Sequence, residues 1–195
     1  MTTMRSIGLA IVLSGVFSLA GCPTPTPTPS GPAQTAGAWT GDLSCDVTQS
    51  LSGAAGNPVN AARAFSTTIN DSGVPTSVRV LGFTGGPDQD AAISQVGDSA
   101  TLNSTSGNLA ITQIVTVTQA RYTSTSADIT LSIEYSATGG ALSQNGTATQ
   151  TIAIRVSGAN LTYSANVNYS VTQLAGTITL DTGEVTDCNG VLSKQ

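Results

Sequence analysis

The chain has 195 residues, a formal net charge of −5 and a charged fraction of only 9%. It contains no histidine, which removes the commonest general base and metal ligand and excludes Ser-His-Asp and Cys-His catalytic arrangements. Its six Lys and Arg residues are scattered singly, so the sequence offers no clustered basic surface for nucleic acid. Composition therefore favours a non-catalytic protein without a cofactor and without a nucleic-acid partner.

The first 21 residues are organised like an export signal. Arg5 precedes an apolar run over 7–20, which is short for a transmembrane span. The run ends in Leu19-Ala20-Gly21-Cys22, a tetrad that resembles the lipobox of bacterial lipoproteins. The resemblance implies removal of residues 1–21 and acylation of Cys22, with palmitate as a typical chain. It also implies a location in the bacterial cell envelope, anchored to a membrane by lipid, with the domain in the periplasm or outside the cell.

A Pro/Thr-rich stretch follows the predicted anchor. Residues 23–32 alternate proline with small polar residues, which disfavours helix and sheet and favours an extended rod. Ten such residues would span about 30 Å. We therefore expect residues 22–36 to be the lipidated cysteine and a tether, and residues 37–195 to be the folded domain. A proline-rich ligand for a protein partner is the alternative for this stretch.

Two further cysteines, Cys45 and Cys188, are predicted to form a disulfide. If Cys22 is lipidated, these two thiols remain as an even pair in an oxidising compartment. Their wide separation would join the first strand of the domain to the last. This arrangement argues against an immunoglobulin-type bridge and favours a closed or nearly closed meander.

Apolar and polar residues alternate with period two from Trp39 onward, as in half-buried strands. We expect strands over 39–47, 63–70, 74–83, 90–96, 99–104, 109–122, 128–135, 151–156, 160–171, 176–181 and 184–192. Turn residues separate them, including Asn145-Gly146 and the triplet at 181–183. The prediction is an all-β domain, an antiparallel meander of roughly 9–11 strands that forms a barrel or flattened barrel. With one Trp, four Tyr and three Phe, the chain cannot build the aromatic girdles of an outer-membrane barrel.

Gly37-Ala38-Trp39 resembles the Gly-X-Trp that opens lipocalins. The resemblance implies a barrel that holds a small apolar ligand, with the tryptophan packed across the closed end. A barrel of many strands with few large inward side chains must leave space or flatten. We therefore expect an apolar ligand-binding cavity near Trp39, Tyr163 and Tyr169, with a barrel flattened into a sandwich as the alternative.

The acidic residues give no sign of a catalytic or metal site. Asp88 and Asp90 provide too few oxygen ligands for calcium and are expected in a solvated turn. Glu134 and Glu184 are expected to alternate away from apolar neighbours, which does not indicate a glycosidase pair. No catalytic residue and no metal ligand is predicted.

Together these features predict an envelope lipoprotein with a non-catalytic β-barrel domain that binds a small apolar ligand. Its partners would be the membrane, through the lipid on Cys22, and either that ligand or another envelope protein. The alternative function is a structural or protein-interaction module of the cell envelope.

Overall fold

The computed structural model describes residues 33–83 and 86–195. The predicted signal peptide, Cys22 and residues 23–32 lie outside the described residues. In the described part, no helix is long and apolar enough to span a membrane. The strands are β1 Gly37–Leu51, β2 Ala54–Ala55, β3 Val59–Ile69, β4 Val78–Val80, β5 Gln89–Ala91, β6 Ser99–Ser106, β7 Leu109–Tyr122, β8 Ser126–Gly139, β9 Leu142–Ser157, β10 Asn160–Ala175 and β11 Ile178–Lys194.

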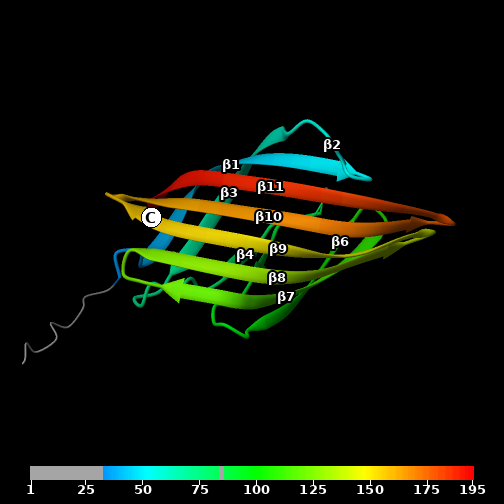
Figure 1. Cartoon of the computed structure of the whole chain (residues 1–195). Helices are drawn as coiled ribbons and strands as arrows, with labels where there is room; N and C mark the ends of the chain where they lie inside the picture. The colour runs from blue at the N-terminus through cyan, green and yellow to red at the C-terminus, as the bar shows by residue number, and fades with distance from the viewer. Residues whose placement is uncertain (1–32, 84–85) are drawn as a thin grey trace, which may run out of the picture. The chain divides into compact units, whose positions relative to one another are not determined.

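Nine of these strands form one large antiparallel sheet (Figure 1). Strands β6 to β11 follow one another as a meander, and β11 pairs with β1. On its other edge β1 pairs with β3 and, near its C-terminal end, with β2. Strands β4 and β5 form a separate two-stranded sheet. The predicted all-β meander is therefore present.

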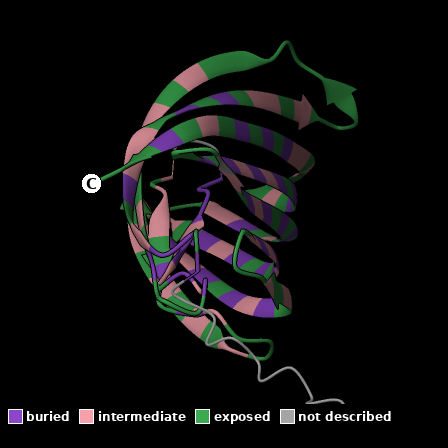
Figure 2. Cartoon of the chain, turned by 90° about the vertical axis from the view of Figure 1, so that its left-hand side faces the viewer, coloured by how far each residue is buried: buried purple, intermediate pink, exposed green. Residues whose placement is uncertain are grey.

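The sheet is not a closed barrel. Its two edges are formed by β3 with β2 and by β6, and no strand pairing joins these edges in the described part of the chain. The first and last strands do lie side by side, as the sequence predicts, but within the sheet instead of at a closure. Residues 70–83 and 86–98, here called the insert, connect the two edges. They run along the concave face of the curved sheet and add no strand that would complete a ring (Figure 2).

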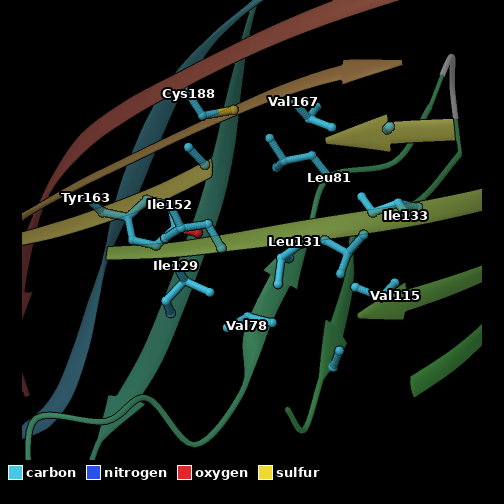
Figure 3. Packing of buried hydrophobic residues seen from close by; sticks show 14 of the residues in the cluster. Val78, Leu81, Val115, Ile129, Leu131, Ile133, Ile152, Tyr163, Val167 and Cys188 are labelled. Atoms are coloured by element: carbon cyan, nitrogen blue, oxygen red, sulfur yellow. The ribbon is translucent and has the colours of Figure 1, made fainter. Parts of the chain in front are cut away.

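The insert supplies side chains that the sheet lacks. Inner-face positions of the sheet alternate with exposed ones, as the burial colours show along the strands (Figure 2). Against them pack buried residues of the insert, among which Val78 and Leu81 face sheet residues such as Leu131 and Val167 (Figure 3). The buried apolar residues of the insert are Val78, Val80, Leu81, Phe83, Ala91 and Ile93. The core therefore lies between the sheet and the insert.

Two polar side chains of the sheet fasten the insert. Gln150 accepts a hydrogen bond from Leu81 N at 3.0 Å through Oε1 and donates from Nε2 to Arg79 O at 2.6 Å. The amide thus replaces the backbone of a neighbouring strand for two peptide groups of the insert. Tyr169 donates to Leu81 O at 2.7 Å and accepts from Gln113 Nε2 at 2.7 Å. Backbone groups that would otherwise be buried without partners are satisfied in this way.

Cys45 and Cys188 form a disulfide across β1 and β11, where the two residues are directly opposite in register. This is the pairing expected from the sequence. Both cysteines are fully buried on the concave face, and Cys188 lies among the core residues of Figure 3. The bridge therefore joins two neighbouring strands that are 143 residues apart in the chain.

Two expected turns are wrong. Asn145-Gly146 lies inside β9, and residues 181–183 lie inside β11, so each of these strands is continuous. The true turns lie nearby, at Gly140 and Gly176, both of which adopt positive φ. Gly146 has a packing role instead, because a Cβ atom there would come within 2.2 Å of Ser170 O on β10.

Candidate functional site

One end of the concave face extends beyond the insert and forms a cleft. The cleft has a volume of about 360 Å³, within the range of small-molecule sites. Its lining residues come from β1, β2 and the loop after it, β9, β10, β11 and the middle of the insert: Gln49, Ser50, Leu51, Ala54, Gly56, Phe83, Gln144, Gln173, Thr182 and Gly183. We call it the uncovered cleft.

Strand register brings the polar residues of the cleft together. Gln173 on β10 is directly opposite Gln144 on β9, and Gln49 on β1 is directly opposite Glu184 on β11. Side chains alternate between the two faces of a strand, so all four residues face the concave side with the buried positions of the same strands. Three amides and one carboxylate therefore lie on neighbouring strands at the same end of the sheet.

Hydrogen bonds hold two of the amides in place. Tyr135 Oη donates to Gln144 Oε1 at 2.9 Å, and Gln144 Nε2 donates to Gln173 Oε1 at 3.1 Å. Burial, and secondarily the charge of Glu184, raises the pKa of Tyr135 to about 12, so its hydroxyl remains a donor at neutral pH. Gln173 Nε2 has no hydrogen bond to a described residue, and it remains available as a donor.

Glu184 lies behind the cleft and is only 2% exposed. Its Oε2 accepts from Gln49 Nε2 at 3.2 Å, and its Oε1 accepts from Thr186 Oγ1 at 3.4 Å. The sequence-based expectation that Glu184 points away from the core is wrong. Glu184 and Cys188 are four residues apart on β11, so their side chains face the same side of the strand. A buried negative charge therefore adjoins the cleft.

An aromatic group separates the cleft from the core. Phe83, in the middle of the insert, lies 5.2 Å from Tyr135 and 5.1 Å from Tyr169 between ring centroids. The two tyrosine rings are 6.0 Å apart in an edge-on arrangement. Phe83 lines the cleft, and the two tyrosine rings pack behind it on the side of the core.

The three residues predicted to bind a ligand are all buried on the concave side, but the structure does not bring them together. Trp39 donates from Nε1 to Thr35 O at 2.8 Å, near the start of β1. Tyr163 packs against Phe65 at 4.3 Å between ring centroids, beside a space of about 10 Å³. Tyr169 packs against Phe83, which lines the uncovered cleft. The insert thus occupies much of the interior in which a cavity was expected.

Acidic residues of the insert take part in ion pairs. Asp88 lies 2.5 Å from Arg63 and also accepts from Gly82 N at 2.9 Å, so it is a fixed contact and not a solvated turn residue. Asp90 binds Arg79 at 2.6 Å. Within the described ranges, no three or more Asp, Glu, Cys or His residues gather in a way that could hold a metal ion.

The described lining of the uncovered cleft therefore combines amide and hydroxyl groups with apolar side chains and contains no charged residue. The signal that could have identified it is the row of inward-facing glutamines at the ends of β9 and β10, beyond the apolar part of each strand. No protein-family model, curated protein or solved structure matches this chain.

Proposed function

We propose that this protein is a lipid-anchored binding module of the bacterial cell envelope, with the uncovered cleft as its ligand site. The observation that carries the proposal is a cleft of about 360 Å³ whose glutamine amides are held in position by hydrogen bonds before any ligand arrives. A pre-arranged site loses less conformational entropy on binding. The domain acts by binding, and no residue is assigned a catalytic role.

The position of the cleft is consistent with an anchor at the N-terminus. The described chain begins at Ala33, whose N donates to Asp71 O at 2.9 Å, and then enters β1 at Gly37. The cleft lies at the other end of β1, around Leu51. A strand of 15 residues is roughly 45 Å long. A lipid on Cys22 would thus be connected to the end of the domain that is remote from the cleft.

A protein-interaction role is the second candidate, and strand β6 favours it. This edge strand, Ser99–Ser106, has one sheet neighbour among the described residues, β7. It contains no charged residue and no proline, which commonly protect sheet edges against a further strand. An envelope partner that contributes an extended segment would pair there.

The test of the binding function is a fragment screen by ligand-observed NMR on a Cys22→Ser variant of the whole exported chain, which lacks the lipid. We expect several fragments to compete with one another for a single site. Gln144→Ala should abolish the binding of these fragments. Trp39 is ten residues from Gln49 along β1, about 33 Å, so its fluorescence should not change. Absence of bound fragments, or binding unaffected by Gln144→Ala, would contradict the proposal.

A further inference from the structure

We infer that the ligand of the uncovered cleft is an amphiphile with an uncharged, hydroxyl-bearing head, such as a sugar headgroup. The head would be held by the glutamine amides, and the apolar part would lie along the exposed inner face of β1, β2 and β11. This inference rests on the proposed function and names the class of ligand.

The polar end of the cleft selects an uncharged head. Gln173 Nε2 is an available donor, and Gln49 Oε1 has no hydrogen bond to a described residue and is an available acceptor. A hydroxyl group both donates and accepts, so neighbouring hydroxyls of one sugar can satisfy both amides. Because the described lining holds no cation, an anionic head would lose its hydration without gaining a counter-charge.

The outer part of the cleft is apolar and exposed. Leu51 and Ala54 line it, and Leu51 is 53% exposed. On β11, Leu180 and Ile178 lie two and four residues before Thr182, so they face the same side of the strand as Thr182. Ile178 is 59% exposed. Because Leu51 and Ile178 are both more than half exposed, the concave face continues beyond the insert as an exposed apolar surface. Exposed apolar residues grouped beside a cleft mark a binding surface.

The order of these two surfaces sets the orientation of the ligand. The amides and Phe83 lie at the inner end of the cleft, and Leu51 and Ile178 lie toward the end of the sheet. An amphiphile would therefore enter head first. A fatty acid has a suitable tail but the wrong charge, and a free sugar has a suitable head but leaves the apolar surface exposed to water.

The test is calorimetric titration of the Cys22→Ser chain with three probes: octyl glucoside below its micelle concentration, glucose and octanoate. We expect octyl glucoside to bind at least about tenfold more tightly than either of the others, because only it uses both surfaces. Octanoate binding as tightly as octyl glucoside, or glucose doing so, would overturn the inference.

Variants separate the two surfaces. Ile178→Ser should remove most of the advantage of octyl glucoside over glucose, and Gln173→Ala should weaken both. Val185→Ser is the matched control, because Val185 is exposed but lies on the convex face next to Glu184, and it should change neither affinity. If screening fragments bind the cleft but octyl glucoside does not, the inference fails and the proposed function stands. If neither binds, both fail.

Discussion

Two parts of the concave face use the same residue types in different ways. Gln150 lies under the insert on β9, and both ends of its amide bond the insert's backbone. Gln144 lies six residues earlier on the same strand, beyond the insert, where its amide bonds only the side chains of Tyr135 and Gln173. Under the insert, an inward amide therefore binds the backbone of the insert. Beyond the insert, Gln144 binds other side chains and positions Gln173, whose Nε2 remains available for a ligand.

This comparison leads to a general expectation about substitutions. Substitutions under the insert should cost stability with little specific effect on binding, and substitutions in the uncovered cleft should cost binding with little effect on stability. Four changes test it, in decreasing order of expected effect.

The largest effect is expected from the disulfide under the insert. In the chain-entropy account, a bridge that closes a loop of 143 residues stabilises the folded state by about 5 kcal/mol. The double variant Cys45→Ser/Cys188→Ser should therefore lose most of that stability in urea unfolding. The parent protein with its bridge reduced is the control, and an unchanged unfolding midpoint would contradict the account.

Gln150→Leu should be the next most costly change. It leaves Leu81 N and Arg79 O buried without partners, which costs about 2–4 kcal/mol in total. Gln173→Leu is the matched comparison beyond the insert; it removes one acceptor, that of Gln144 Nε2, instead of two hydrogen bonds, so it should cost about 1 kcal/mol. Equal losses of unfolding free energy for the two variants would show that the insert is not fastened in this way.

Two buried tyrosines provide a finer comparison. Tyr169→Phe removes a hydroxyl that bonds both Leu81 O and Gln113 Nε2, at a cost of about 1–3 kcal/mol. The Tyr163 hydroxyl is buried and has no hydrogen-bond partner among the described residues, so Tyr163→Phe should be neutral or slightly stabilising. Thermal unfolding of both variants measures the difference in stability. A larger loss of stability in Tyr163→Phe than in Tyr169→Phe would contradict this interpretation of the two hydroxyl groups.

The smallest effect concerns the end of the insert. Asp98 Oδ2 accepts from Ser94 N at 2.9 Å and Gln95 N at 2.8 Å, and these bonds lower the pKa of Asp98 below its ordinary value. A lowered pKa in the folded state contributes stability above the unfolded pKa, near 4, and this contribution is lost as the pH falls through the folded pKa. Asp98→Asn should therefore flatten the rise of stability with pH over the acidic range. The same slope in the variant and the parent would contradict this role.

Much of the strand pattern could be predicted from the sequence, because one buried face leaves a period-two signal. Trp39, Leu43 and Cys45 share the inner face as expected, and Cys45 lies beside Cys188. The open sheet could not be predicted in this way. Alternation shows that a face is buried but not what buries it, and residues 70–98 resemble further strands as much as an insert.

The site was less predictable for a related reason. Residues 181–183 have the composition of a turn, yet they continue β11. Glu184 was expected to point away from its apolar neighbours, but its neighbour Val185 is the exposed side chain and Glu184 the buried one. Counting back in twos from the inward Cys188 would have placed Glu184 correctly. That Gln144 and Gln173 lie opposite each other depends on the register of β9 and β10, which side-chain pattern alone does not determine.

The most direct test of the uncovered cleft is to observe the glutamine side chains of both regions in one experiment. In ¹⁵N-labelled Cys22→Ser protein titrated with octyl glucoside, the side-chain amide signals of Gln49, Gln144 and Gln173 should shift saturably. Those of Gln113 and Gln150, under the insert, should remain in place. Saturable shifts at Gln150 or at Trp39 Nε1 without shifts in the cleft would contradict the account.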